Sequence, residues 1–358
     1  MKILVIQQKM IGDVLTSSII CDNLKRSRPN SIVHYMINEN TESVIKNHPS
    51  IDKLVLFKKE YRSNKFQLYK FLKLIRKEKY DVVIDAYGKL ESNLTSFFSG
   101  AKTKIAWEKS YTKWIYNKTY DSSQRQESNN LAVKDRLLLV ESFIDNKKII
   151  VKPKIYLTDA EKKEAESFLK QFKLSLDDKI IMISVLGSSK NKTYPATYSA
   201  QLLDQIVKKT GAYLLFNYIP SQFDQAKEVY DHCNLQTQNH IKLDAFTPSL
   251  RSFLAVLSHC NALIGNEGGA VNMAKALNVP TFSIFSPWIN KEAWHLFADE
   301  NNQAIHLKDV KPDLYQNLSR KQQKENALIL YREFEPALIT EKLISFLTHI
   351  YPSNKHEA

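Results

Sequence analysis

Apolar segments of strand length alternate with segments of helical periodicity along almost the whole chain, and this alternation constrains the fold more than any other sequence feature. Short apolar runs without polar alternation are typical of strands buried on both faces of a parallel sheet. The first half carries KILVIQ, SIVHYMI, DKLVLF and DVVIDAY, and the second half carries KIIMISVL, AYLLFNY, HIKLDA, ALIGN and TFSIF. The sequence therefore predicts an α/β protein with two successive parallel sheets.

Helices are expected between these strands wherever apolar residues recur at a spacing of three or four. The expected helices cover 14–24, 41–49, 61–79, 133–143, 160–172, 196–209, 222–233, 249–258, 270–277 and 337–349. The polar run at 121–130 predicts a loop.

The domain boundary is expected near Pro153, just before a helix start at 158–161. We expect a first domain at 1–155, a second at 156–335, and a C-terminal amphipathic helix and tail at 336–358. Loops at the carboxyl ends of parallel strands are the usual ligand-binding positions in such folds, so we expect a ligand cleft between the two domains.

Composition excludes several classes of protein. Charged residues make up 25% of the 358 residues, Gly and Pro number 8 and 11, and no segment approaches the roughly 18 consecutive apolar residues of a membrane span. The N-terminus lacks the pattern of a signal peptide, so we expect a cytoplasmic location. The odd number and wide spacing of Cys21, Cys233 and Cys260 argue against disulfides and against a zinc site.

Positive charge is concentrated in the first half of the chain. Residues 1–150 hold 27 Lys and Arg against 16 Asp and Glu, a balance of +11, whereas residues 151–358 hold 24 against 22, a balance of +2. This asymmetry indicates a polyanionic partner, whether nucleic acid, an anionic lipid surface or a phosphorylated acceptor. A generally basic proteome is the alternative. The stretch 61–79 adds a basic amphipathic pattern suited to a membrane face or a lipid-linked glycan. An ordinary helix with one core face and one solvated basic face is the alternative.

Three segments that follow expected strands carry residues suited to chemistry. In the first, Gly12 allows a tight turn, and Asp13 stands where a helix N-cap belongs. Asp13 is also placed to remove a proton from an acceptor hydroxyl at the carboxyl end of the first strand.

The second segment runs from Gly187 to Pro195, after the first strand of the second half. Small residues such as Ser188 beside Lys190 and Lys192 suggest a phosphate cradle, because backbone N–H groups and ammonium groups can converge on an anion. Neither GxxxxGK[ST] nor GxGxxG is present, so a P-loop and an ordinary dinucleotide site have little support. A solvated loop without function is the alternative.

The third segment, 264–277, runs from a strand through Glu267, Gly268 and Gly269 into a helix of small residues beginning at Ala270. Free N–H groups at a helix start suit a diphosphate, and the Glu267 carboxylate could accept hydrogen bonds from sugar hydroxyls. Capping of the helix by the carboxylate is the alternative.

In this order and at these separations, the three segments resemble glycosyltransferase family 9, the ADP-heptose:lipopolysaccharide heptosyltransferases of the GT-B fold. The resemblance extends over nearly the whole chain. It includes GDVL at 12–15, DVVIDAYGKLES at 81–92, AKTKIAW at 101–107, KTYP at 192–195, where the family usually has Lys-x-Trp-Pro, and the segment 264–277. It implies two Rossmann-like domains facing each other across a cleft, the first binding the acceptor and the second the nucleotide-sugar.

The resemblance also implies roles for individual residues. Asp13 matches the general base, Lys192 matches the lysine that holds the donor phosphates, and Glu267 matches the acid that contacts the donor sugar. The backbone amides of Gly268, Gly269 and Ala270 match those that bind the diphosphate. The third motif of the family usually reads Asp-Thr/Ser-Gly-x-x-His, so Glu267 replaces an Asp here and Asn272, a neighbour of the donor site, replaces a His. Phe285-Ser286-Pro287 replaces the usual Phe-Gly-Pro.

The expected function is therefore that of an inverting glycosyltransferase. It would move a sugar, heptose by resemblance, from a nucleotide-diphospho-sugar, ADP-heptose by resemblance, to a lipopolysaccharide core-type acceptor at the cytoplasmic face of the inner membrane. No cofactor or metal is expected, because helix-end amides and basic side chains can stabilise the departing diphosphate. Two alternatives stay open: a transferase of the same fold with another nucleotide-sugar, and a non-catalytic polyanion-binding protein. Nucleic acid is not an expected partner, since no RNP-like motif, helix-turn-helix or zinc module is present.

Overall fold

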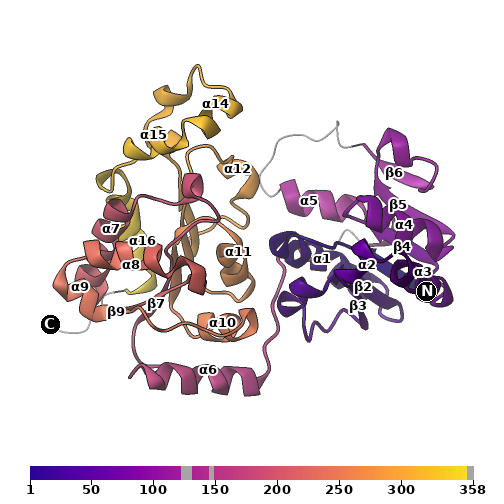
Figure 1. Ribbon diagram of the computed structural model, residues 1–358, viewed down its shortest axis with the longest axis horizontal. Coiled ribbons are helices and arrows are strands. Elements are labelled where there is room, and N and C mark those ends of the chain that lie inside the picture. Colours follow the sequence, from indigo (N-terminus) through magenta and orange to yellow (C-terminus); the bar gives the residue numbers. More distant parts are fainter. Residues whose placement is uncertain (122–130, 145–148, 353–358) are drawn as a thin grey trace. The chain divides into compact units, whose positions relative to one another are not determined.

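The structure is a computed structural model, and it describes residues 1–121, 131–144 and 149–352. The chain divides into two compact units, Met1–Tyr156 and Leu157–Ala358, and each unit is built on a parallel six-stranded sheet (Figure 1). Apart from Asp121, the loop expected at 121–130 lies outside the described residues.

The first sheet has the strand order β3-β2-β1-β4-β5-β6, and every neighbouring pair is parallel. The strands β1 and β4 are completely or almost completely buried except at Lys2, because helices cover both faces of the sheet. The strands are β1 (Lys2–Ile6), β2 (Ile32–Asn38), β3 (Lys53–Phe57), β4 (Val82–Asp85), β5 (Thr103–Trp107) and β6 (Lys118–Tyr120).

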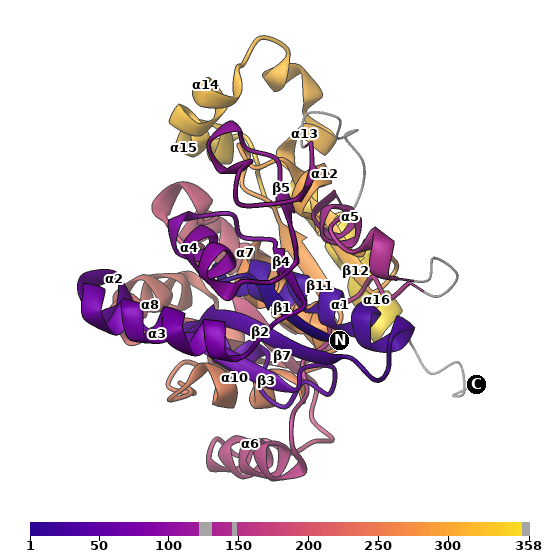
Figure 2. The same cartoon turned by 90° about the vertical axis from the view of Figure 1, so that its right-hand side faces the viewer.

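Two layers of helices enclose this sheet, as Figure 2 shows. The helices α2, α3 and α4 lie on one face, and α1 and α5 lie on the other. Their bounds are α1 (Ile11–Ser27), α2 (Glu60–Ser63), α3 (Lys65–Lys77), α4 (Leu90–Ser99) and α5 (Leu131–Leu138). The chain leaves β1 toward one neighbour, β2, and later returns to the other, β4, so the loop after β1 lies at the point where the strand order reverses. Such switch points are the usual ligand sites of open α/β sheets.

The second sheet has the order β12-β11-β10-β7-β8-β9 and repeats this plan, with its switch point between β7 and β10. Its strands are β7 (Ile180–Ser184), β8 (Tyr213–Phe216), β9 (Ile241–Lys242), β10 (Ala262–Asn266), β11 (Thr281–Ile284) and β12 (Asn302–Ile305). Its helices are α6 (Asp159–Gln171), α7 (Ala196–Thr210), α8 (Phe223–His232), α9 (Leu235–His240), α10 (Leu250–Leu257), α11 (Gly269–Ala276), α12 (Lys291–Trp294), α13 (Leu307–Val310), α14 (Arg320–Glu325), α15 (Ala327–Arg332) and α16 (Ala337–Ile350).

Helix α16, expected as part of a separate C-terminal segment, packs into the core of the second unit. Its residues Ile339, Leu343, Phe346 and Leu347 are fully buried, and the ring of Phe346 lies 5.6 Å from that of Phe282 on β11. Helix α16 is therefore part of the second unit and not a separate segment.

Three local predictions in the first unit were wrong in detail. The segment expected as a helix at 41–49 contains only a 3₁₀ helix, Glu39–Val44. The helix expected at 61–79 is interrupted at Asn64, whose side chain accepts hydrogen bonds from the N–H groups of Phe66 and Gln67 and so begins α3. Helix α1 begins at Ile11, so Gly12 lies inside the helix and not in a turn.

No helix in the described part of the chain combines the length and the apolar character that a bilayer span requires. All three cysteine thiols are buried and unpaired.

Candidate functional site

Asp13 lies in the first turn of α1, immediately beyond the carboxyl end of β1. It is the third helical residue, and not the N-cap that the sequence suggested, because the helix begins at Ile11. One carboxylate oxygen, Oδ1, accepts a hydrogen bond from Arg136 Nη2 at 2.8 Å. The other oxygen, Oδ2, accepts from the backbone N–H of Met10 at 3.3 Å. The carboxylate is thus held in place while its side chain stays 33% exposed.

Arg136 is a site residue that the sequence analysis missed. It comes from α5, which packs against α1, and its guanidinium is fixed by two further contacts. Its Nε donates to Ser17 Oγ at 3.1 Å, and its Nη1 donates to the carbonyl oxygen of Ala132 at 3.0 Å. Nothing in the local sequence of α5 distinguishes this arginine from a surface cation, because the contact joins residues 123 positions apart.

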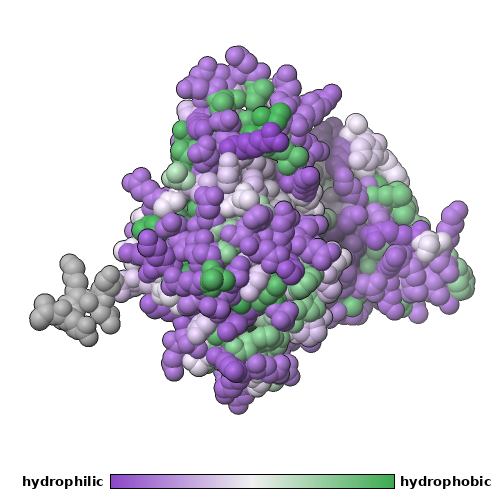
Figure 3. Space-filling view, turned by 60° about the vertical axis from the view of Figure 1, so that its left-hand side comes forward, coloured by the Kyte–Doolittle hydropathy of each residue, from purple (hydrophilic) through white to green (hydrophobic). Residues whose placement is uncertain are grey.

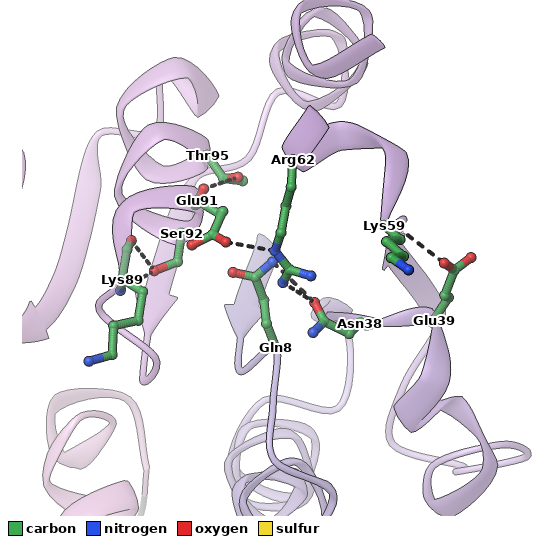
Figure 4. A network of polar contacts seen from close by, with 9 residues as sticks. All are labelled: Gln8, Asn38, Glu39, Lys59, Arg62, Lys89, Glu91, Ser92 and Thr95. Atoms are coloured by element: carbon green, nitrogen blue, oxygen red, sulfur yellow. Dashed lines mark hydrogen bonds and ion pairs between the residues drawn. The ribbon is translucent and has the colours of Figure 1, made fainter. Parts of the chain in front are cut away.

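A second polar cluster lies at the carboxyl ends of β1, β2 and β4 (Figure 4). The guanidinium of Arg62 donates to Glu91 Oε1 at 2.8 Å and to Asn38 Oδ1 at 3.3 Å, and Gln8 Nε2 donates to the same Asn38 oxygen at 3.4 Å. Burial works against ionisation of Glu91, but the contacts with Arg62 and a backbone hydrogen bond together leave the pKa of Glu91 below its ordinary value. This edge of the sheet therefore offers fixed charged and amide groups to a polar ligand.

The turn between β4 and α4 is organised by the fully buried Asp85. Its Oδ1 accepts from the N–H groups of Tyr87 and Gly88 at 2.9 and 2.8 Å, and its Oδ2 accepts from the hydroxyl of Tyr116 at 2.6 Å. Burial raises the pKa of Asp85, although these hydrogen bonds favour its charged form. The carboxylate acts as a structural anchor of the turn.

In the second unit, the loop after β7 folds back tightly on itself. A Cβ at Gly187 would lie 2.1 Å from the carbonyl oxygen of Lys192, so only glycine fits there. Thr193 Oγ1 accepts from the N–H of Gly187 and donates to the carbonyl of Ser189, both at 3.0 Å. Ser188 is exposed and lines a cavity of about 720 Å³. The walls of this cavity also include Lys190, Tyr194, Gln225, Tyr331 and Arg332.

Asn266, at the end of β10, ties this loop to the third motif, and it too was missed from the sequence. Its side chain is buried; its Oδ1 accepts from the N–H of Tyr194 at 2.7 Å, and its Nδ2 donates to the carbonyls of Ser184 and Val185 at 2.9 Å each. Because Glu267 follows directly, these bonds fix the start of its side chain relative to the loop that carries Lys192.

Lys192 and Glu267, predicted separately from two motifs, form an ion pair with Nζ 3.4 Å from Oε1. The ammonium also lies 5.4 Å from the centre of the Trp288 ring. That ring is held by a hydrogen bond from its Nε1 to the carbonyl of Asn191 at 3.0 Å. The structure therefore brings the predicted lysine and acid together.

Helix α11 begins directly beyond this ion pair. Gly268 is its N-cap residue and Gly269 its first residue, and a Cβ built at either position would meet no other atom within 4 Å. Ala270 is buried in the first turn, and Asn272 is half-buried farther along the helix. The first N–H groups of a helix have no partner within it, so this open approach suits an anion.

Comparison with known proteins agrees with this architecture. The family model of glycosyltransferase family 9 (heptosyltransferase) matches residues 68–321, a range that includes the second-unit motifs and leaves out Asp13. Lipopolysaccharide heptosyltransferase 1 of Campylobacter coli is 27% identical over 292 residues, which cover 80% of this chain and 84% of the relative.

Two solved structures share the fold over nearly their full length. A family 9 glycosyltransferase from Veillonella parvula superposes with a TM-score of 0.74 at 18% identity, covering 93% of this chain and 97% of that one. An Escherichia coli heptosyltransferase with ADP-2-deoxy-2-fluoro heptose gives a TM-score of 0.65 at 14% identity, covering 93% and 98%. The fold is GT-B, and this chain belongs to glycosyltransferase family 9 and is a glycosyltransferase.

Proposed function

We propose that this glycosyltransferase transfers heptose from ADP-heptose to a hydroxyl of a lipopolysaccharide core-type acceptor, with inversion at the anomeric carbon and without a metal ion. The names of its relatives support the sugar and the pathway: the Campylobacter coli relative is a lipopolysaccharide heptosyltransferase, and the similar Escherichia coli structure contains an ADP-heptose analogue. The observation that carries the proposal is the Lys192–Glu267 ion pair at the open start of α11.

The donor sugar is assigned to Glu267. Its Oε1 is buried and, within the described ranges, has no hydrogen-bond partner beyond the ionic contact with Lys192. The hydroxyl of Tyr331, which is buried nearby on α15, also lacks a partner in the described structure, and burial raises its pKa, so it stays protonated. Buried polar atoms of this kind normally have partners, and a sugar hydroxyl can both donate and accept. A bound sugar hydroxyl would donate the missing hydrogen bond to Glu267 Oε1.

The diphosphate is assigned to the first N–H groups of α11, at Gly269 and Ala270, together with Lys192 and the loop that carries Ser188. The helix dipole and the ammonium charge both favour an anion there. As the bond between the anomeric carbon and the diphosphate oxygen breaks, these fixed groups stabilise the charge that develops on the departing ADP. This electrostatic stabilisation removes the need for a metal at that step.

The proton of the acceptor hydroxyl is assigned to Asp13. Arg136 binds Oδ1, whereas Oδ2 has only the 3.3 Å contact with Met10 N–H and keeps a lone pair for the proton. The deprotonated oxygen attacks the anomeric carbon and displaces the diphosphate in one step, which inverts the configuration. The nearby Arg62 cluster offers contacts to the acceptor, and the basic first unit suits a phosphorylated one.

Thermal stabilisation by a panel of nucleotide-sugars and nucleoside diphosphates tests the donor assignment. ADP and ADP-heptose should raise the unfolding temperature of the wild type, and Lys192→Ala and Glu267→Ala should lose most of this shift. Lys311→Ala, which breaks the exposed ion pair with Glu333, is the matched control. This variant should show the same rise in unfolding temperature with ADP and ADP-heptose as the wild type.

Three outcomes would overturn parts of the proposal. Selective stabilisation by another nucleotide would keep the fold and change the donor. No response to any donor, combined with salt-sensitive binding to polyanions, would favour a non-catalytic binding protein. A product with retained anomeric configuration by nuclear magnetic resonance would refute the single displacement.

A further inference from the structure

Helix α3 carries large hydrophobic side chains on the face that does not pack against the core. Phe66, Tyr69 and Leu74 are 62%, 52% and 60% exposed, whereas Phe71 and Ile75 on the opposite side are buried. A helix that packs on a sheet needs only one apolar face. The exposed aromatic and aliphatic groups are therefore not explained by the fold.

The same helix is uniformly basic. It holds five cations and no acid, and none of these cations lies within 4.0 Å of a carboxylate in the part of the chain that the structure describes. Two of them cover aromatic rings: the ammonium of Lys70 lies 4.3 Å from the Phe66 ring centre, and that of Lys73 lies 5.4 Å from the Tyr69 ring centre. The positive charge of the helix is thus uncompensated. The five cations are Lys65, Lys70, Lys73, Arg76 and Lys77.

A second group of exposed aromatic residues lies on α4 and on the segment after β5 in the same unit. Phe97 and Phe98, in the last turn of α4, are 46% and 39% exposed, and Trp114 is 70% exposed with its ring 5.3 Å from that of Phe97. Trp114 Nε1 donates to the carbonyl of Tyr111 at 3.2 Å, which holds the indole in place.

The helices α3 and α4 pack side by side (Figure 2). The guanidinium of Arg76 lies directly against Gly100, where a Cβ would come within 1.5 Å of Nη1. We call the exposed side chains of α3, of the last turn of α4 and of residues 110–114 the α3–α4 surface.

We propose that the α3–α4 surface docks this protein on an anionic lipid bilayer. Tyr and Trp favour the interface between water and lipid, where one end of the side chain is apolar and the other is hydrated. Each basic residue near an anionic surface strengthens binding about fivefold, and apolar insertion combined with a polybasic patch gives stable attachment. A nucleic acid fits less well, because Lys70 and Lys73 already cover the rings of Phe66 and Tyr69 that bases would stack on. The proposal does not depend on the donor or on the reaction.

Flotation with vesicles of phosphatidylglycerol and phosphatidylcholine, compared with vesicles of phosphatidylcholine alone, tests the proposal with the full chain. The triple variant Lys70→Gln, Lys73→Gln, Lys77→Gln should bind the anionic vesicles about 100-fold more weakly. Phe66→Ala and Trp114→Ala should each weaken binding severalfold, because the interfacial contact is lost.

Matched controls remove similar groups from the second unit. The triple variant Lys208→Gln, Lys209→Gln, Lys227→Gln removes the same charge from exposed positions. Hydrophobic side chains also gather over α14 and α15 (Figure 3), where Ile329 is 60% exposed like Leu74, so Ile329→Ala is the apolar control. Both controls should bind as the wild type does.

Several results would overturn the proposal: equal loss of binding in the control triple variant, unchanged binding in the α3 triple variant, equal binding to neutral vesicles, or binding to duplex DNA without binding to vesicles. Transfer to a water-soluble acceptor fragment should be unchanged in the α3 variants, which separates loss of docking from loss of catalysis.

Discussion

Replacing Asp13 with Asn tests the assigned base most directly, because the amide keeps the shape of the carboxylate and removes its charge and its ability to take a proton. The amide oxygen can keep the 2.8 Å contact with Arg136, and only the long contact with Met10 N–H is lost. The ion pair is 33% exposed on the Asp13 side and 15% on the Arg136 side, so solvent screening limits its contribution. We expect the free energy of unfolding to fall by about 1 kcal/mol or less.

Turnover should fall much more. Loss of a general base costs about 10²- to 10⁴-fold in rate, which corresponds to roughly 3–5 kcal/mol of activation free energy. Donor affinity should stay unchanged, since the groups assigned to the donor are in the second unit. The assay measures release of the nucleoside diphosphate at saturating donor and acceptor, with thermal unfolding recorded in parallel. Glu39→Gln is the control, because that exposed carboxylate accepts the N–H of Lys59 at 3.1 Å and is not among the groups assigned to catalysis (Figure 4). A folded Asp13→Asn variant with kcat within tenfold of the wild type would refute the reasoning.

Three further predictions follow from the second unit. Gly268→Ala should leave the unfolding temperature unchanged, because its Cβ would meet no other protein atom within 4 Å. The added methyl group should weaken donor binding, measured by calorimetry, about tenfold. An unchanged affinity would show that the diphosphate does not bind at the start of α11. Hydrogen bonds from Arg251 lower the pKa of Glu161 to about 2, so the carboxylate stabilises the fold above its unfolded pKa and this stabilisation is lost as the pH falls toward 2. Glu161→Gln should therefore lower the free energy of unfolding by about 1–2 kcal/mol at pH 7, since solvent screens part of the interaction, and the difference from the wild type should shrink from pH 5 to pH 3; a difference independent of pH would contradict the ionic origin. A chelator such as EDTA should leave the transfer rate within about twofold of its value without chelator, and a rate restored only by a divalent cation would show that a metal takes part.

The central strands of both sheets were predicted from sequence, because strands buried on two faces are continuous apolar runs. The strands β1, β4, β7 and β10 all fall within predicted segments. The apolar pattern of the sequence did not predict β5, β6 or β12. These strands lie at or next to sheet edges, where solvent permits polar residues such as Lys104, Lys118 and Gln303, so the apolar pattern is interrupted.

Helix boundaries were less predictable than helix positions. The helical periodicity of 61–79 continues through Asn64. An asparagine side chain can either stay outside the hydrogen bonding of a helix or replace a backbone carbonyl as acceptor, and the apolar pattern does not say which. In the structure the Asn64 side chain accepts the N–H groups of Phe66 and Gln67 and begins a new helix. The start of α1 shows the same limit: Asp13 suits an N-cap and equally suits the third helical position, where its carboxylate accepts the N–H of Met10.

Some residues of the candidate site were predictable from the sequence and others were not. Lys192 and Glu267 could be named from sequence because each stands in a motif with a strand before it and a helix after it. Arg136 and Asn266 could not, because their roles consist of contacts with residues 123 and 72 positions away. The Asn266 contacts join the end of β10 to the end of β7 and to the loop before α7, whereas the Arg136 contact joins two helices on one face of the other sheet.

The sequence by itself determined the α/β class, the two successive parallel sheets and the loops that carry the chemistry, because hydrophobic periodicity and turn residues act over a few neighbouring positions. Tertiary structure alone decided which side chains meet: the Arg136–Asp13 pair, the Lys192–Glu267 pair, and the hydrogen bonds by which Asn266 joins β10 to the loop that carries Lys192. Strand order and helix packing set these distances, and neither is a property of a short segment. The α3–α4 surface depends on both, since the basic pattern is local, whereas exposure of its rings depends on what the rest of the fold leaves uncovered.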